Sequence, residues 1–461
     1  MQAPFDIAAD LDTPVSAFLK LGPLGPRYLL ESVEGGERLA RYSFLGFGAA
    51  LEVRMDGSGL TIDGVTGPRP ATQAAYLDAL RAVLATAPRP VPAVEGLPFT
   101  GGLVGVSGYD VVRLFERLPR RAVPEHALPD AAFAATESLL VFDHLTRRVA
   151  LLHAGPETER LRLRSEVIGR LRGPVPRLPQ AMATGAAAAG MSEADYCDRV
   201  RACKEYIASG DIYQIVISVP FRGRTTVPPF EVYRAMRLIN PSPYMFYFDF
   251  GELKVVGSSP EALVRLHGRR ASLRPIAGTL PRGADADEDA ANEARLLADP
   301  KEAAEHVMLV DLARNDLGRV ARPGSVRVHP YRSIERYSHV MHLVSGVEGE
   351  LDAAHDQFDL FAASFPAGTL VGAPKVRAME IIEEMEATGR GLYGGTAGYF
   401  GVSGDMDQAI TIRTLVFAGD EYSFQAGAGI VADSVPAREY QEVLAKGAIL
   451  RRALEIAGDG L

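Results

Sequence analysis

Two pairs of glutamates, Glu302 with Glu305 and Glu439 with Glu442, have a spacing that could bind a cation. Both pairs lie in segments with helical character, and residues three apart on a helix share a face, so each pair sets two like charges side by side. Mg²⁺ takes a few carboxylate oxygens and completes its shell with waters and an anionic substrate. Lys446, one turn beyond Glu442, could hold an anion on the same face. The alternative is two solvated helix faces that bind nothing.

Glycine-containing turn segments concentrate between residues 274 and 430. Gly278 and Thr279 in one segment can offer a backbone N–H and a hydroxyl, and Tyr393 in another precedes two glycines. Backbone N–H groups in such turns form anion-binding concavities. Together with the lysine and the glutamates, these turns predict a pocket for a small substrate that carries two carboxylates.

An arginine would complete such a pocket, because its planar fork fits a carboxylate. We predict a strand over residues 409–417, on which Arg413 shares a face with Thr411 and Leu415. The glycines at 427 and 429 end a second strand. Their G-x-G-x-x-A pattern is typical of dinucleotide-binding loops, but that motif requires a helix directly after the first glycines. Here the helix is expected only near Pro436, which argues against a nicotinamide or flavin.

Composition excludes several classes of function. The chain has 461 residues, 49 basic and 58 acidic, and its net charge of −9 argues against nucleic acid as a partner. Its 2 cysteines form neither a disulfide framework nor a metal motif, which fits a reducing compartment. We find no signal peptide and no apolar run of membrane-spanning length, so we expect a cytoplasmic protein without a membrane partner.

A stretch rich in proline, alanine and glycine divides the sequence. We expect an N-terminal region over residues 1–175, a linker or exposed loop over 176–190, and a catalytic region over 191–461. The last region should open with a helix capped by Ser192.

Several long motifs resemble the chorismate-utilising enzymes, and most closely the anthranilate synthase large subunits. They are Pro275-Ile-Ala-Gly-Thr279, the segment from Glu305 to Gly318, Phe365-Pro-Ala-Gly-Thr-Leu-Val-Gly-Ala-Pro-Lys375 and Gly427-Ala-Gly429. The resemblance covers almost the whole chain. One departure is Leu280, where the family usually has arginine. The fold implied is α+β, with large antiparallel β-sheets packed face to face, helices outside, and the N- and C-terminal regions interleaved.

The activity implied is that of a lyase that aminates chorismate at C2 with ammonia, expels the C4 hydroxyl and eliminates pyruvate to give anthranilate, the first step of tryptophan biosynthesis. By resemblance, Glu305 and Glu442 would ligate Mg²⁺, and Glu302 and Glu439 would reach it through water. Glu261 matches the acid for the leaving hydroxyl, and His342 the histidine near the ring. The residues that would hold the substrate are Gly278, Thr279, Tyr393, Arg413, Gly427, Ala428, Gly429 and Lys446. Alternatively, Glu261 is a partner in a helix cap and His342 is a histidine of the core.

Two positions separate related reactions. The aminodeoxychorismate synthases carry lysine where this chain has Ala277, and a methyl group cannot attack the ring. The isochorismate and salicylate synthases carry a water-activating lysine where this chain has Gln214, and a neutral amide is no general base at neutral pH. Ala277 and Gln214 therefore favour ammonia as the nucleophile over both alternatives.

Two motifs resemble the family's site for feedback inhibition by tryptophan. One is Leu29-Leu-Glu-Ser32, and the other is a proline-bracketed turn that contains Pro243, Tyr244 and Met245. The alternative is a strand packed against an ordinary turn. Since the chain has no amidotransferase signature, a separate glutamine amidotransferase subunit (anthranilate synthase component II) and a hetero-oligomer are implied. An alternative of another class is a non-catalytic tryptophan-sensing protein with the same fold.

Overall fold

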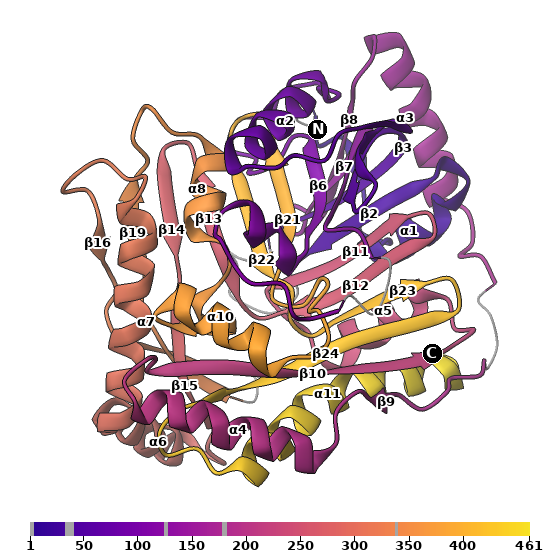
Figure 1. Ribbon diagram of the computed structural model, residues 1–461. Coiled ribbons are helices and arrows are strands. Elements are labelled where there is room, and N and C mark those ends of the chain that lie inside the picture. Colours follow the sequence, from indigo (N-terminus) through magenta and orange to yellow (C-terminus); the bar gives the residue numbers. More distant parts are fainter. Residues whose placement is uncertain (1–3, 33–40, 124–127, 178–181, 337–339) are drawn as a thin grey trace.

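The computed structural model describes residues 4–32, 41–123, 128–177, 182–336 and 340–461. The fold is α+β, with a large curled antiparallel sheet and helices outside it (Figure 1). Two long strands, β3 (Tyr42–Asp56) and β7 (Ala131–Asp143), pair along their whole length with a bulge between Phe47 and Ala50. A bulge bends a strand. The sheet divides into two arms at this pair.

The first arm continues from the start of β7. From there each strand pairs with the next through six strands, and the arm ends at a seventh, short strand at the edge of the sheet. The strands in that order are β6 (Gly102–Ser107), β21 (Thr396–Gly401), β22 (Met406–Ile410), β13 (Ala262–His267), β14 (Arg270–Leu273), β19 (Val347–Glu350) and β16 (Arg327–Val328).

The second arm continues from the start of β3 and ends at a long strand with two short neighbours. Its strands are β2 (Pro26–Glu31), β11 (Tyr244–Phe250), β12 (Leu253–Ser259), β23 (Thr414–Ala418), β24 (Glu421–Ile430) and β10 (Gln214–Arg224), with β20 (Gly372–Ala373) and β9 (Ala188–Ala189) beside β10. Four shorter strands extend β3 and β7 on their other sides, namely β4 (Gly59–Ile62), β5 (Val65–Gly67), β8 (Arg148–His153) and β1 (Ile7–Ala8).

Successive side chains of a strand pack into two different hydrophobic cores. On β11, Phe246 and Phe248 belong to a core built from strands of both arms and the segments that join them, with no helical residue. Tyr247 between them points the other way and packs with Phe230 of α5 (Pro229–Ile239). Since neighbouring side chains of a strand face opposite sides, the two arms pack face to face and the helices cover their outer faces. This arrangement confirms the predicted fold class.

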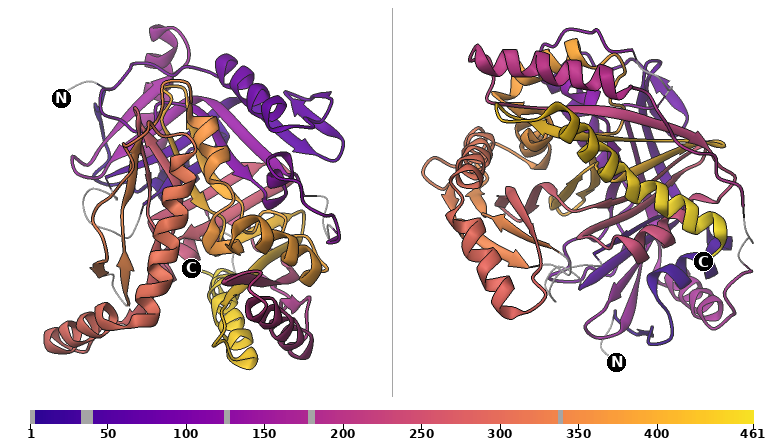
Figure 2. Two further views of the ribbon diagram at one scale, coloured as in Figure 1. Left: turned by 60° about the vertical axis from the view of Figure 1, so that its left-hand side comes forward. Right: turned by 90° about the horizontal axis from the view of Figure 1, so that it is seen from below.

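Helices cover both outer faces. The helix α11 (Pro436–Asp459) packs on β24 and against α5 and α4 (Glu193–Ala208), as Figure 2 shows from below. Ser192 caps α4 by accepting a hydrogen bond from the Asp195 N–H, which confirms the predicted helix start. The other helices are α1 (Pro14–Lys20), α2 (Gln73–Thr86), α3 (Glu157–Leu171), α8 (Gln357–Ser364), α9 (Gly368–Val371) and α10 (Lys375–Met385), with 3₁₀ turns at Gly22–Leu24 and Tyr109–Leu114.

A small separate sheet stands beside the main one. It consists of β15 (Ile276–Pro281), β18 (Val340–Val344) and β17 (Ser333–Arg336), with β18 in the centre. Its buried core consists of Met341 and Leu343 of β18 and Leu296 of the helix α6 (Ala286–Ala298). The long helix α7 (Pro300–Gly318) follows α6 directly and packs on β15 and β19. The two glutamates of α7 therefore lie where the small sheet meets the main body.

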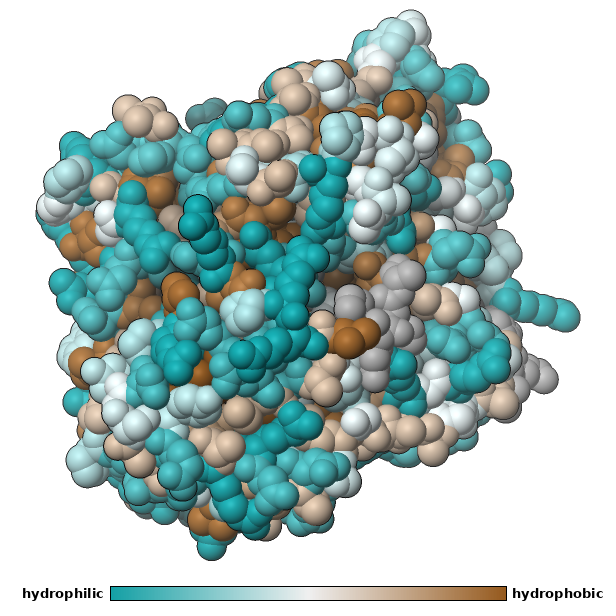
Figure 3. All heavy atoms as spheres, viewed as in Figure 1, coloured by the Kyte–Doolittle hydropathy of each residue, from teal (hydrophilic) through white to brown (hydrophobic). Residues whose placement is uncertain are grey.

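The regions expected from the sequence share the main sheet. Strand β2 pairs with β11, and β6 pairs with β21, so strands from before and after the expected linker alternate in space. Part of that linker, residues 178–181, lies outside the described residues, and its end pairs with β10 as β9. No helix in the described part of the chain has the length and apolar character to cross a bilayer. On the face in Figure 3, hydrophilic side chains predominate and the hydrophobic ones form small separate patches.

Candidate active site

A glutamate of α11 lies near enough to α7 for its charge to act on Glu305. Burial raises the pKa of Glu305, and the negative charges of Glu302 on the same helix and Glu442 on α11 raise it further, although Lys301 lowers it. The pKa of Glu439 is also raised, by burial first and by Glu442 among its neighbours. Like charges from two helices that are distant in the sequence thus act on the Glu305 carboxyl group.

These carboxylates fit a hard dication. Oxygen donors that repel one another are the set that Mg²⁺ accepts, and nearby lysines only partly offset their charge. Lys446 lies 2.7 Å from the Glu442 carboxylate (Nζ to Oε1), with both side chains about half exposed. Over the ranges that the structure describes, no three His, Cys, Asp or Glu side chains come close enough together to hold a metal ion.

A glycine allows the small sheet to approach the first glutamate pair. Gly278 has a φ of 62°, and a Cβ there would lie 2.9 Å from the Glu302 Oε2. A larger residue would therefore be strained and would displace the carboxylate. Thr279 lies opposite His342 in the β15–β18 ladder, but its side chain is outside the described part of the structure. His342 alternates with Met341 and Leu343, so its ring lies on the face away from their core.

Glu261 connects β12 with β13, at the edge of the same region. The Thr369 hydroxyl donates a hydrogen bond to its carboxyl (Oγ1 to Oε1, 2.9 Å). Burial raises the pKa of Glu261 to about 7, against the opposing effects of that hydrogen bond and of the Lys446 charge. A carboxyl with this pKa can give up a proton near neutral pH. Thr369 was missed as a site residue, although it stands in the Phe365–Lys375 motif.

The β10–β24 pairing builds a wall that carries the candidate glycines. Its register sets Gly427 opposite Ser218, and Gly429 opposite Val216. A Cβ at Gly427 would lie 2.6 Å from the Tyr393 hydroxyl, and one at Gly429 would lie 3.0 Å from the Gln214 Nε2. Both side chains therefore lie directly against bare backbone.

Several polar groups of this wall converge. The Lys446 ammonium donates a hydrogen bond to the Gly427 carbonyl at 3.0 Å. The Gln214 amide oxygen is buried without a hydrogen-bond partner among the described residues. Ala428 is fully buried, so only its backbone can face a ligand. Lys446 thus joins the glycine wall to Glu442 and, electrostatically, to Glu261.

The strand predicted over residues 409–417 is wrong at its centre. The chain leaves β22 after Ile410 and enters β23 at Thr414, and Arg413 between them has a φ of 49°. A left-handed residue breaks the alternation of a strand, so Arg413 does not share a strand face with Thr411 and Leu415. Its guanidinium lies 3.5 Å from the Asn240 side-chain oxygen. Its carbonyl accepts from the Ser258 N–H on β12, the strand that leads to Glu261.

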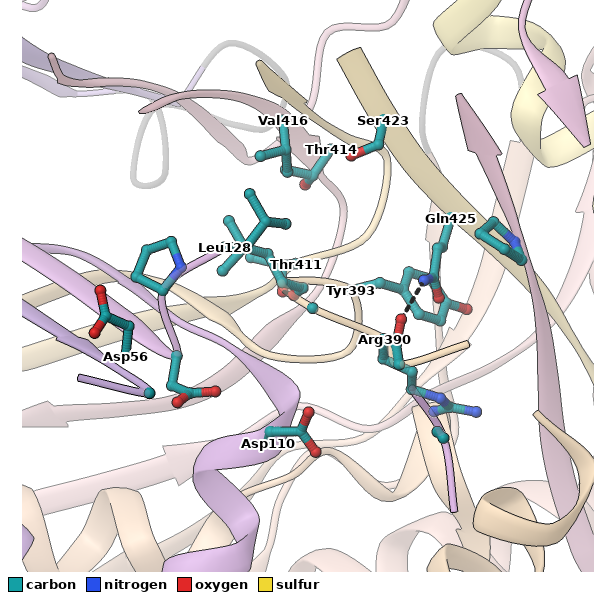
Figure 4. A pocket seen from close by; sticks show the side chains of 18 of the residues that line it. Asp56, Asp110, Leu128, Arg390, Tyr393, Thr411, Thr414, Val416, Ser423 and Gln425 are labelled. Carbon is teal, nitrogen blue, oxygen red and sulfur yellow. Dashed lines mark hydrogen bonds between the residues drawn. The ribbon is translucent and has the colours of Figure 1, made fainter. Parts of the chain in front are cut away.

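A cavity of about 740 Å³ lies behind this wall. Figure 4 shows Arg390, Tyr393 and Gln425 on its side, and a hydrogen bond joins the Gln425 amide to the Gly389 carbonyl (3.0 Å). Of the candidate substrate residues, Tyr393 alone lines this cavity. The Tyr393 ring therefore separates it from the glycine wall.

The candidate effector residues lie together at another place. The β2–β11 register sets Glu31 opposite Met245, so Ser32 and Tyr244 adjoin the same end of the ladder. The Ser32 hydroxyl is buried without a hydrogen-bond partner among the described residues. Pro243 and Tyr244 line a cavity of about 430 Å³, and Ala262, directly after Glu261, lines it too.

Comparison with known proteins gives a consistent result. The family model described as chorismate binding enzyme matches residues 25–452. The chain is 48% identical over 458 residues to "Anthranilate synthase component 1" of Thermus thermophilus, covering 98% of this chain and 97% of that protein. It is 44% identical to the protein of the same name from Pseudomonas aeruginosa, over 98% of this chain and 95% of the relative. The crystal structure of anthranilate synthase component I from Streptococcus pneumoniae superposes with a TM-score of 0.81 at 35% identity, covering 89% of this chain and 92% of that one.

The raised pKa of Glu261 predicts how stability depends on pH. The folded state holds this proton more tightly than the unfolded chain, so the unfolding free energy should fall as pH rises from 4.5 to about 7 and should then level off. Over that interval, the unfolding free energy of the wild type should drop by about 3 kcal/mol relative to the unfolding free energy of Glu261→Gln. Urea unfolding at a series of pH values measures this.

The control is Glu455→Gln, at the surface of α11, whose unfolding free energy should change with pH as that of the wild type does. If the unfolding free energies of the wild type and Glu261→Gln changed in parallel with pH, the assignment would be contradicted.

Proposed function

Because the chain belongs to the family of chorismate-binding enzymes, we propose that it converts chorismate to anthranilate as the large subunit of an anthranilate synthase. The observation that carries this proposal is the extended similarity to relatives of that name over nearly the whole chain. The site supports it chemically, because it combines carboxylates, a lysine and bare glycine backbone with a carboxyl group that can act as an acid near neutral pH.

Glu261 would protonate the C4 hydroxyl of chorismate as it leaves. With a pKa of about 7, its carboxyl is substantially protonated at neutral pH and can donate the proton that turns hydroxide into water. The Thr369 hydroxyl orients the carboxyl by donating to one oxygen, which leaves the other free to face the substrate. His342, on the open face of β18, would serve the later elimination of pyruvate, in which the ring loses a proton as the C3–O bond breaks.

The substrate's two carboxylates would be held separately. Lys446, Tyr393 and the backbone of Gly427–Gly429 form one polar wall. Arg413, whose guanidinium lies 3.5 Å from the Asn240 side-chain oxygen, would supply a further cation. Mg²⁺, held by Glu305 and Glu442 with Glu302 and Glu439 behind them, would draw electrons from the other carboxylate. Thr279 would contact the substrate from β15.

Ammonia is the nucleophile that the site favours. Ala277 is a buried residue of β15 and offers only a methyl group. Gln214 is neutral, and its amide oxygen, which bonds no described residue, can accept a hydrogen bond from ammonia but cannot deprotonate water. A glutamine amidotransferase subunit would supply ammonia from glutamine.

The first prediction of this function concerns the product. With chorismate, Mg²⁺ and ammonium salts, the purified chain should form anthranilate, identified by fluorescence and mass, because its own residues supply the acid and the substrate site. Glutamine should replace ammonium only when an amidotransferase subunit is added. Isochorismate or 4-amino-4-deoxychorismate as the sole product would refute the proposal, and no turnover at all would favour a non-catalytic sensor.

The second prediction concerns the metal. Glu305→Gln and Glu442→Gln should each lower kcat/KM by about two orders of magnitude or more, because a bound metal contributes several kcal/mol to such a transition state. Both variants should also need more Mg²⁺ for half-maximal chorismate binding, as measured by calorimetry. Asp311→Asn removes another carboxylate of α7, which pairs with Arg314 at the surface, and should behave as wild type. Wild-type turnover by either glutamine variant would contradict the metal assignment.

Tryptophan would bind at the second place as an inhibitor. The buried Ser32 hydroxyl has no hydrogen-bond partner within the described part of the chain, so it offers a hydrogen bond to the ligand's ammonium or carboxylate group. The cavity that Pro243 and Tyr244 line shares Ala262 with the strand that follows Glu261, which gives a contiguous path to the acid. Binding there would weaken chorismate affinity, and chorismate would weaken tryptophan binding by the same factor.

The third prediction tests this regulation. Ser32→Ala should raise the tryptophan concentration for half-inhibition about ten- to a hundredfold, as expected for one lost hydrogen bond to a charged group. Uninhibited turnover should stay near normal, since the Ser32 hydroxyl bonds none of the residues that the structure describes. Inhibition curves at fixed chorismate measure the effect, with Ser165→Ala on α3 as the control. Superimposed curves for wild type and Ser32→Ala would remove Ser32 from the effector site.

A further inference from the structure

A buried ion pair lies beneath the proposed substrate pocket. Arg390 and Glu386 have side chains that are 1% and 4% exposed. The guanidinium donates to both carboxylate oxygens, from Nε to Oε2 at 2.9 Å and from Nη2 to Oε1 at 2.7 Å. Two charges this far from water are costly unless every polar atom is satisfied. The remaining partners of the pair therefore show what it holds in place.

The remaining partners belong to two other segments, α9 and β10. The Arg390 guanidinium donates to the Leu370 carbonyl of α9 at 2.7 Å and to the Val216 carbonyl of β10 at 2.8 Å. The Glu386 carboxylate accepts from the Ser218 N–H at 2.7 Å and from its hydroxyl at 3.0 Å. One ion pair thus ties α9 and β10 to the turn that follows α10.

Those segments carry the candidate substrate residues. Leu370 follows Thr369, whose hydroxyl holds Glu261. Val216 pairs with Gly429, and Ser218 pairs with Gly427. A small shift of α9 or β10 would therefore move the acid or the glycine wall.

Besides the acid and the glycine wall, the Arg390 guanidinium also supports the Tyr393 ring. Its central carbon lies 5.7 Å from the centre of that ring and 4.9 Å from the centre of the Tyr109 ring. Figure 4 shows Arg390 beside Tyr393 at the side of the larger cavity. A cation near aromatic rings is attracted by their π electrons, so Arg390 fixes the ring whose hydroxyl lies against Gly427.

We propose that Arg390, held by Glu386, is a positioning residue that sets the distance between the acid, the tyrosine and the glycine wall of the chorismate pocket. This inference rests on the proposed function. Arg390 acts through Thr369, Tyr393 and β10 rather than by touching the substrate. Lysine cannot replace it, because one ammonium cannot reach Glu386, Leu370 and Val216 in the planar arrangement of a guanidinium.

The test separates positioning from stability. Arg390→Lys keeps the charge opposite Glu386. The double variant Arg390→Met with Glu386→Gln removes both charges and keeps an amide that can bond Ser218. A buried ion pair can often be replaced by uncharged groups without loss of stability, so this double variant should melt within a few degrees of the wild type. In both proteins, calorimetric Kd for chorismate in Mg²⁺ should rise about tenfold or more, with KM in the ammonium assay rising in parallel.

A second buried pair provides the matched control. Arg113 and Glu383 have side chains 11% and 4% exposed, and their other partners are the Asp110 carboxylate, the Pro119 carbonyl and the N–H groups of Arg121 and Ala122. The variant Arg113→Met with Glu383→Gln should leave the Kd for chorismate unchanged. Wild-type Kd in Arg390→Lys, or equal losses of affinity from both pairs, would overturn the inference. A wild type that does not bind chorismate would instead refute the proposed function.

Discussion

Repulsion between carboxylates of α7 and α11 is the constraint on which the candidate site depends. The two helices begin at residues 300 and 436, yet Glu302 and Glu442 both raise the pKa of Glu305. Nothing in the local sequence favours this approach, so tertiary structure must enforce it. The fold concentrates negative charge at a rim that a dication would neutralise.

Contacts along both helices hold them there. In α7, Asp299 caps the first turn by accepting from the N–H groups of Lys301 and Glu302. Near its end, Asp316 is buried and binds the Lys375 ammonium at 3.0 and 2.9 Å, which anchors the helix to α10. The helix α11 is fixed over most of its length by β24, α4 and α5. The glutamate carboxylates take no part in these contacts, so they can remain charged and partly exposed.

The sequence indicated the parts of the site better than their arrangement. The glutamate spacing, the capped helix after Ser192 and the helix from Pro436 depend on local rules, and the structure has each element there. The central break in the strand around Arg413 was missed, because its left-handed φ follows from long-range packing and its residue type gives no warning. The Arg390–Glu386 pair was missed for a similar reason. Its i, i+4 spacing is common at protein surfaces, and only the tertiary structure buries it beneath the pocket.

The most direct test of the converging carboxylates is a crystal structure of the protein with Mn²⁺ and chorismate, with anomalous differences recorded to locate the metal. Mn²⁺ accepts the oxygen ligands that Mg²⁺ takes and scatters anomalously. The account predicts a peak between the Glu305 and Glu442 carboxylates, with Glu302 and Glu439 behind it and a chorismate carboxylate oxygen among the ligands. A peak at another place, or an ordered chorismate without any metal between α7 and α11, would contradict it.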